Sequence, residues 1–214
     1  MIKRPGAVVF DCDGVLVDSE PHSLIAWLEV LDGFGHPATE ADIEACIGLG
    51  YVPTHEFLSS IEPIPPPGDV WSSLLEALER SFRGGLEVFP DAVAVLDAAI
   101  AAELPVAVAS ASSRQRLDLT LGVAGLIERF AVSVAGDEVA AEKPDPAVYL
   151  AAIRALDRSA SGVVAIEDSA AGATSAVRAG LDVIAIARHP ADLAPLAAVG
   201  VRVVERLEPA LLGL

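Results

Sequence analysis

The sequence reads Ala7-Val8-Val9-Phe10-Asp11-Cys12-Asp13-Gly14 close to its start, with four apolar residues running directly into a pair of carboxylates. The apolar run has the length of a fully buried strand. Gly14 favours a turn directly after that strand. Asp11 and Asp13 are therefore expected at the carboxyl end of a strand, which is the edge where open parallel sheets bind their ligands.

Helices and strands alternate in the later part of the chain. Apolar residues at helical spacing predict helices over 92–102, 114–121, 146–156 and 169–179. Short apolar runs predict strands over 106–109, 131–135, 163–166, 183–187 and 201–204. Such alternation gives a parallel sheet with helices on both faces. The expected fold is therefore α/β, with a Rossmann-like, doubly wound parallel sheet.

A block of helices interrupts this alternation after the first strand. The expected helices cover 21–31, a stretch from an N-cap at Thr39 through Ile47, 54–61, and 69–82 after a stiff proline loop at 63–67. We therefore expect two domains, a Rossmann-like core of residues 1–17 and 87–214 and an inserted all-helical cap of residues 18–86.

The composition excludes several classes of partner. The formal net charge is −17, which argues against nucleic acid and against anionic membrane surfaces. Two cysteines do not make a disulfide framework and fit a reducing compartment. We see no signal peptide and no apolar stretch long enough to span a membrane. A cytoplasmic protein is expected, and a monomer is the default.

Polar residues follow the next strands as well. They are Ser110-Ala111 after the second strand, Gly136-Asp137-Glu138 with Lys143 a little further on after the third, and Glu167-Asp168-Ser169 after the fourth. Clustered carboxylates repel one another and need a cation, and ligands that are all oxygen select Mg²⁺. A carboxylate can also attack phosphorus, and lysine is a common point-charge partner for phosphate.

Each of these short motifs has an ordinary structural explanation. Ser110 could be an N-cap, and Glu167-Asp168 could simply be a favourable start of a helix. Their common position at strand ends, in one order along the chain, instead favours a single phosphoryl-transfer site.

Four segments of the chain resemble the motifs of the haloacid dehalogenase superfamily. In chain order they are Asp11 to Pro21, Val106 to Ser110, Lys143 to Pro146, and Ile166 to Gly172. The resemblance covers essentially the whole chain, including a helical cap at the expected place. It is strongest for the branch that holds β-phosphoglucomutases and sugar-phosphate phosphatases.

The resemblance implies a role for each acidic residue of the expected site. Asp11 would be the nucleophile and a metal ligand. Asp13 would be the general acid and base, and its backbone carbonyl would help to hold Mg²⁺. Asp168 would be a further metal ligand, and Glu167 would support the metal shell.

The resemblance also implies how the substrate would be bound. Ser110 and the Ala111 N–H would bind the phosphoryl group, and Lys143 would counter its charge. His22 and Arg114 are left without a role: His22 lies one place before the histidine of mutase-like relatives, and Arg114 is as consistent with a surface residue as with a substrate contact.

The expected function is Mg²⁺-dependent hydrolysis of a small phosphate ester, a sugar or polyol monophosphate, through an aspartyl-phosphate. A β-phosphoglucomutase-like phosphosugar mutase is the alternative. A mutase must grip a second phosphate, but the only cations in residues 18–86 are Arg80 and Arg83, against 12 acidic residues. Asp13 argues against a dehalogenase and, with the helical insert, against a phospho-receiver; the absence of lysine from the cap argues against a phosphonate hydrolase.

Overall fold

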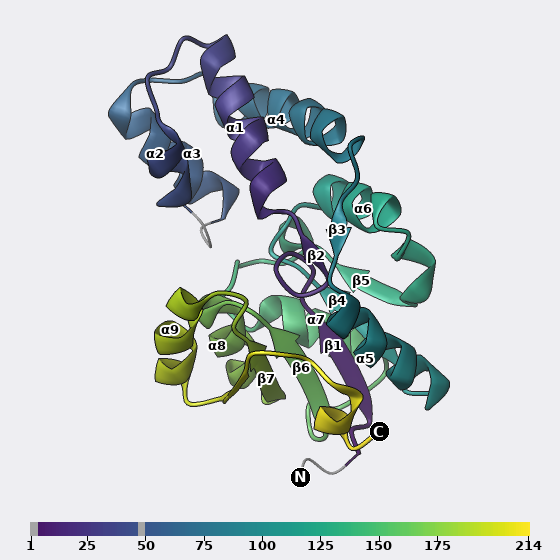
Figure 1. Ribbon diagram of the computed structural model, residues 1–214. Coiled ribbons are helices and arrows are strands. Elements are labelled where there is room, and N and C mark those ends of the chain that lie inside the picture. The colour runs from purple at the N-terminus through teal and green to yellow at the C-terminus, as the bar shows by residue number, and fades with distance from the viewer. Residues whose placement is uncertain (1–3, 47–49) are drawn as a thin grey trace. The chain divides into compact units, whose positions relative to one another are not determined.

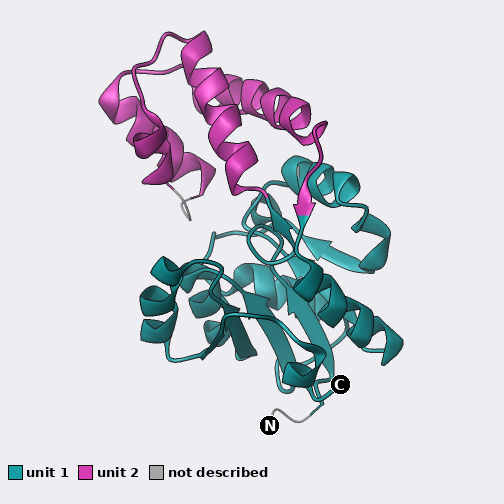
Figure 2. Ribbon diagram, in the orientation of Figure 1, with its two compact units in different colours: residues 1–18, 88–214 teal, residues 19–87 magenta. Residues whose placement is uncertain are grey.

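The computed structural model describes residues 4–46 and 50–214. The chain divides into two compact units, residues 1–18 with 88–214, and residues 19–87 (Figure 2). The predicted boundaries between core and cap fall after residues 17 and 86, one residue before each boundary in the structure.

The first unit is built on a six-stranded parallel sheet (Figure 1). Its strands are β1 (Ala7–Phe10), β4 (Val106–Ala109), β5 (Val132–Val134), β6 (Val163–Glu167), β7 (Asp182–Ile186) and β8 (Arg202–Val204). The order across the sheet is β5-β4-β1-β6-β7-β8, and every neighbouring pair is parallel. The central strand β1 is completely buried, as its unbroken apolar run predicts.

Helices flank both faces of this sheet. They are α5 (Pro90–Ala101), α6 (Arg114–Val123), α7 (Ala147–Ala155), α8 (Ala170–Arg178) and α9 (Leu193–Val199). Val9 and Ala165 belong to a buried cluster that includes residues of α7 and α8. Val8, which is equally buried, points to the other face because side chains alternate along a strand. This arrangement confirms the predicted doubly wound α/β fold.

The regular structure among the described residues of the second unit is helical, apart from Glu87 at its end, which begins the short strand β3 (Glu87–Val88). Its helices are α1 (Glu20–Gly33), α2 (Glu40–Glu44), α3 (Tyr51–Ile61) and α4 (Pro67–Phe82). Thr39 caps α2 as predicted, in a reciprocal capping box with Asp42. The predicted end of that helix, Ile47, lies outside the described residues. Pro67 begins α4 instead of ending the preceding loop, because proline suits the first turn of a helix.

Other elements were not expected from the sequence. They are the helix α9, the short paired strands β2 (Val17–Asp18) and β3 (Glu87–Val88), and the 3₁₀ helices η1 (Ile127–Arg129), η2 (Gly136–Glu138), η3 (Pro190–Asp192) and η4 (Pro209–Leu212). Ser113, and not Ser110, is the N-cap of α6, and its hydroxyl accepts from the Arg116 N–H. The ordinary explanation of Ser110 as an N-cap is therefore wrong.

The strand order places a crevice at the carboxyl ends of β1 and β6. The chain leaves β1 toward β4 on one side, and it leaves β6 toward β7 on the other side. Two neighbouring strands whose connections diverge in this way open a crevice between their ends, and ligands of open sheets bind there. Asp11 follows β1, and Glu167 is the last residue of β6.

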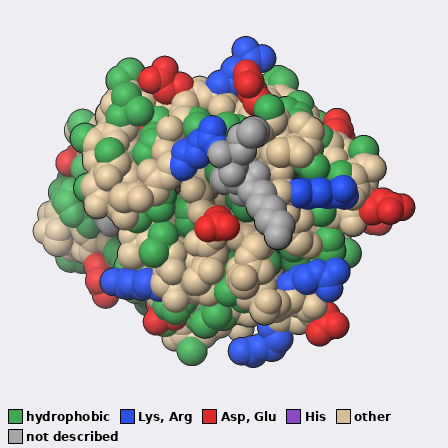
Figure 3. Space-filling model, turned by 90° about the horizontal axis from the view of Figure 1, so that it is seen from below, with side chains coloured by type: hydrophobic (Ala, Val, Ile, Leu, Met, Phe, Trp, Pro, Cys, Tyr) green, Lys and Arg blue, Asp and Glu red, His purple; other side chains and the backbone are tan. Residues whose placement is uncertain are grey.

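The described surface is mixed in character. On the face drawn in Figure 3, Lys and Arg side chains stand apart, with acidic and apolar side chains among them. None of the helices among the described residues is both long and apolar enough to cross a membrane. The cytoplasmic location and the monomeric state stay predictions.

Candidate active site

Lys143 lies at the centre of the crevice. Its ammonium donates to Asp11 Oδ1 at 2.7 Å, to Glu167 Oε1 at 2.6 Å and to the Ala109 carbonyl at 3.0 Å. It also lies over the Tyr149 ring, 5.1 Å from the centroid. Burial opposes its charge, but the two carboxylates raise the pKa of Lys143 well above its ordinary range, so the lysine stays protonated.

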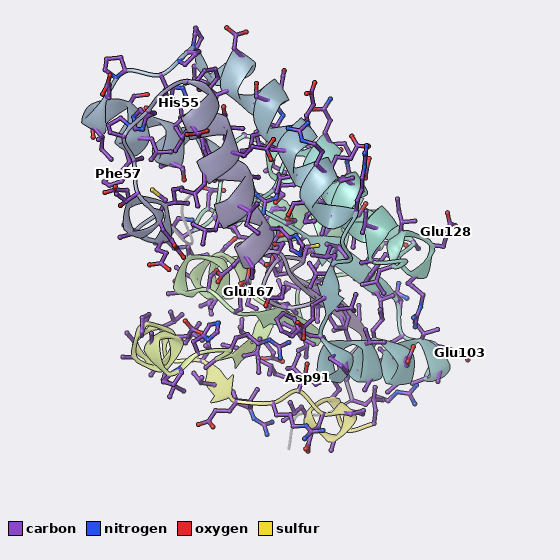
Figure 4. All side chains as sticks on the ribbon, turned by 45° about the horizontal axis from the view of Figure 1, so that its top comes forward. His55, Phe57, Asp91, Glu103, Glu128 and Glu167 are labelled. Carbon is purple, nitrogen blue, oxygen red and sulfur yellow. The ribbon has the colours of Figure 1, made fainter. Side chains whose placement is uncertain are left out.

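Glu167 is fully buried and accepts five hydrogen bonds (Figure 4). Oε1 accepts from Lys143 and, at 2.8 Å, from the Tyr149 hydroxyl. Oε2 accepts from the backbone N–H groups of Asp168 and Ser169 and from the Ser169 hydroxyl, at 3.1 to 3.2 Å. A carboxylate has about four lone-pair sites in all. The lone pairs of Glu167 are thus already used by protein donors.

Asp11, Glu167 and Asp168 can bring one carboxylate oxygen each within 4.8 Å of one another. When all three are ionised, as a bound cation would favour, their three negative charges exceed the single positive charge of Lys143 by two. Burial, with a further contribution from neighbouring carboxylates, raises the pKa of Asp11 to about 7 although Lys143 opposes the rise. An all-oxygen donor set with two surplus negative charges fits a hard divalent cation.

Two glycines allow the carboxylates to approach the backbone. A Cβ on Gly14, whose φ is +77°, would lie 1.9 Å from Asp168 Oδ2. A Cβ on Gly172, in the first turn of α8, would lie 1.8 Å from Glu167 Oε1. The first and fourth motifs therefore need glycine because each glycine backbone packs directly against a carboxylate of the site.

Asp13 is held by two side chains of the loop and helix that follow β4. The Ser112 hydroxyl donates to Asp13 Oδ2 at 2.9 Å, and Arg116 Nη2 lies 3.4 Å from Oδ1. Neither partner was predicted. Ser112 belongs to the run Ser110-Ala111-Ser112-Ser113 that directly follows β4, so its position at a strand end was a usable signal. Arg116, one helical turn further on, gave no sequence signal of its own.

Ser110 and Ala111 lie at the carboxyl end of β4, the strand that neighbours β1. The buried Ser110 hydroxyl accepts from the Ser112 N–H at 3.0 Å. A Cβ on Gly136 would lie 2.4 Å from the Ala111 carbonyl oxygen, so the loops after β4 and β5 touch. These contacts fix the backbone of the predicted phosphate-binding segment.

Arg114 is occupied by its own neighbours. Its guanidinium donates to both oxygens of Glu138 at 3.0 and 2.7 Å, to Asp118 at 3.0 Å and to the Ser133 carbonyl at 2.8 Å. Its backbone N–H donates to Asp137. Asp137 and Glu138, which also follow a strand, are therefore structural partners of Arg114.

The histidines of the helical unit have partners within it. His22 Nδ1 is 2.7 Å from the Ser81 hydroxyl, and its ring lies edge-on to Phe82. His36 and His55 are buried, and each ring contacts backbone carbonyls. His36 and His55 are therefore internal hydrogen-bonding groups of this unit.

Comparison with known proteins agrees with this geometry. The profile of the haloacid dehalogenase-like hydrolase family matches residues 8–186. The chain belongs to this family. The match confirms the resemblance seen in the motifs, and it confirms that the chain is an enzyme of the hydrolase class.

Relatives from the family include sugar-phosphate enzymes. A phosphorylated carbohydrates phosphatase of Thermotoga maritima is 30% identical over 180 residues, which cover 82% of each chain. A fructose-1-phosphate phosphatase of Escherichia coli is 28% identical, with 86% of this chain and 97% of that protein covered. The structure of a β-phosphoglucomutase homologue from Thermotoga maritima is 27% identical with a TM-score of 0.79, covering 97% and 96% of the two chains.

The Gly172 contact generates a prediction about stability. Gly172→Ala should lower the free energy of unfolding by about 1–3 kcal/mol, because the added methyl group must displace the buried Glu167 carboxylate. Gly122→Ala is the matched control, since Gly122 also lies in a helix but has open space around it. That control should gain about 0.5–1 kcal/mol. Urea denaturation measures both, and equal behaviour of the two variants would contradict the packing argument.

Proposed function

We propose that this enzyme is a Mg²⁺-dependent phosphatase that hydrolyses a sugar or polyol monophosphate through an aspartyl-phosphate on Asp11. The observation that carries the proposal is the buried ion pair of Asp11 and Lys143 beside Asp168 and Glu167. The names of the relatives, which include phosphatases for phosphorylated carbohydrates and fructose 1-phosphate, support the class of substrate.

The reaction proceeds in two displacements. A carboxylate oxygen of Asp11 attacks phosphorus while the bond from phosphorus to the leaving oxygen breaks, and Asp13 donates its proton to that oxygen. Asp13 then takes a proton from a water molecule, which attacks phosphorus and breaks its bond to Asp11. Free alcohol and inorganic phosphate are the products. The bonds from Ser112 and Arg116 aim the Asp13 carboxyl for both proton transfers.

The positive charge needed by a phosphate dianion comes from two sources. Lys143, already bonded to Asp11, offsets the repulsion between that carboxylate and the substrate. Ser110 and the Ala111 N–H bind the phosphoryl oxygens. A bound Mg²⁺ would supply further charge compensation, held by the Asp11 and Asp168 carboxylates and the Asp13 carbonyl. Glu167, whose lone pairs are used by protein donors, acts by holding Lys143 and the backbone of Asp168.

The distribution of arginines favours hydrolysis over the mutase alternative. Within the helical unit Arg80 pairs with Glu29 and Glu76, and Arg83 pairs with Glu79. In the core, Arg114 is held by Glu138 and could grip a second phosphate only by giving up those bonds. A monophosphate with a neutral polyol group makes no such demand.

The first test separates the two catalytic aspartates. Asp11→Asn should abolish the phosphoenzyme, because an amide oxygen is a poor nucleophile. Asp13→Asn should slow turnover of a sugar phosphate by about 10²–10⁴-fold but affect phosphoenzyme formation from p-nitrophenyl phosphate far less, since that leaving group needs little protonation. Intact-protein mass spectrometry after rapid quenching detects the intermediate. An adduct that resists hydroxylamine, or one that persists in Asp11→Asn, would require another nucleophile.

The second test concerns the metal. Mg²⁺ should raise the melting temperature of the wild type, because it neutralises the surplus charge of the cluster. Asp168→Asn should keep a stable fold without Mg²⁺ and lose the Mg²⁺-dependent rise. Glu167→Gln should lower the melting temperature in both conditions, because Lys143 loses a charged partner. Thermal unfolding with and without chelator gives these values, and equal responses of both variants would contradict the division of roles.

The third test decides between water and a sugar hydroxyl as acceptor. The enzyme with β-glucose 1-phosphate and Mg²⁺ should release glucose and inorganic phosphate in equal amounts. Glucose bisphosphates should be poorer substrates than sugar monophosphates. Enzymatic product analysis distinguishes the outcomes, and accumulation of glucose 6-phosphate with little free phosphate would establish the mutase instead.

A further inference from the structure

Arg188 lies just beyond β7 and outside all four motifs. We propose, on the basis of the function proposed above, that Arg188 is a positioning residue for Asp13. Its guanidinium binds the loop that contains Asp13 and ties this loop to the first turn of α5. No role for it follows from the sequence. Arg188, Asp13 and Asp91 all lie within the first unit of the chain.

One edge of the guanidinium binds the Asp13 loop. Nε donates to the Gly14 carbonyl at 3.0 Å, and Nη2 donates to the Val15 carbonyl at 2.9 Å. Both residues are buried, so neither carbonyl could exchange this donor freely for water. Because Gly14 and Val15 directly follow Asp13, fixing their peptide planes fixes the backbone from which the Asp13 side chain projects.

The other edge is anchored by Asp91, at the first turn of α5 (Figure 4). Nη1 contacts Asp91 Oδ1 and Oδ2 at 3.0 and 2.9 Å, and the guanidinium stacks on Phe89, 3.7 Å from the ring centroid. Asp91 also accepts from the N–H groups of Ala92 and Leu207. Burial opposes its charge, yet these bonds lower the pKa of Asp91 below its usual value, so the anchor is ionised near neutral pH.

The loop itself is tight enough to transmit this restraint. The Gly14 N–H donates to the Val17 carbonyl at 2.9 Å, and the Leu16 N–H donates to the Cys12 carbonyl at 2.9 Å. The carbonyls of Gly14 and Val15 are the ones that Arg188 binds. A planar guanidinium has enough N–H donors to bond to two neighbouring carbonyls and a carboxylate at the same time. The single ammonium of a lysine at this position cannot replace all these bonds.

A purely structural role predicts something different. If Arg188 only joins β7 to α5, its loss lowers the amount of folded enzyme and reduces all activities alike. If Arg188 positions Asp13, its replacement should slow mainly the step in which Asp13 donates a proton. The leaving group of the substrate distinguishes the two cases.

The experiment compares Arg188→Lys with wild type on a sugar monophosphate and on p-nitrophenyl phosphate. Phosphoenzyme formation from the sugar phosphate should slow by about 10- to 100-fold, in line with a small misplacement of a catalytic group. Formation from p-nitrophenyl phosphate should change by less than about threefold, and Asp13→Asn should set the upper limit of the effect. Asp91→Asn, which loosens the same clamp from its other end, should show the same selective loss and serves if Arg188→Lys fails to fold.

The double variant Asp13→Asn/Arg188→Lys completes a mutant cycle. It should be no slower on the sugar phosphate than Asp13→Asn alone, because Arg188 acts through Asp13. Arg129→Lys is the matched control, since Arg129 pairs with Asp97 on the same helix α5 at an exposed site. It should leave both rates unchanged.

Two results would overturn the proposal: equal losses on both substrates in the clamp variants, or additive losses in the double variant. Failure of the proposed function looks different. In that case the wild type forms no phosphoenzyme, or Asp13→Asn itself shows no dependence on the leaving group. The positioning role would fall with it.

Discussion

The buried ammonium of Lys143 holds the site together. It contacts the residue after β1, the last residue of β6 and the final carbonyl of β4, so one cation bridges the ends of three neighbouring strands. Without it, Asp11 and Glu167 would be two like charges in a buried space, an arrangement that costs several kcal/mol per ion. The crevice of the sheet can therefore carry clustered carboxylates because a single lysine, charged at all relevant pH values, lies among them.

Close backbone packing then fixes where those charges lie. Gly14 and Gly172 bring the chain against Asp168 and Glu167 at distances that a side chain would forbid. Tyr149 donates to Oε1 of Glu167, and the backbone amides after β6 donate to Oε2. The carboxylates are consequently held apart from one another in defined positions before any cation binds, which lowers the reorganisation that binding requires.

Much of this could be predicted from the sequence, because the decisive residues lie at strand ends. The apolar run before Asp11 and the alternation of helices and strands are local patterns, and parallel strands bring their carboxyl ends to one edge. Partners set by tertiary contact could not be predicted. Arg188 meets Gly14 across 174 positions of the chain, and Arg116 meets Asp13 across 103. The sequence left Arg114 open as a substrate contact, because its bonds to Glu138 depend on the packing of the loop after β5 and cannot be seen in the sequence.

The distribution of charge also bears on the choice of substrate. A chain with 31 acidic and 14 basic residues repels anions in general. Several of its arginines are paired with acidic neighbours, as in Arg80 with Glu29, Arg129 with Asp97 and Arg188 with Asp91. Within the crevice, positive charge for a ligand would come from Lys143 and from the cation that the carboxylate cluster would bind. Under the proposed function such a site would attract one phosphate at short range, and the proposed preference for a monophosphate would rest on repulsion elsewhere as much as on attraction at the crevice.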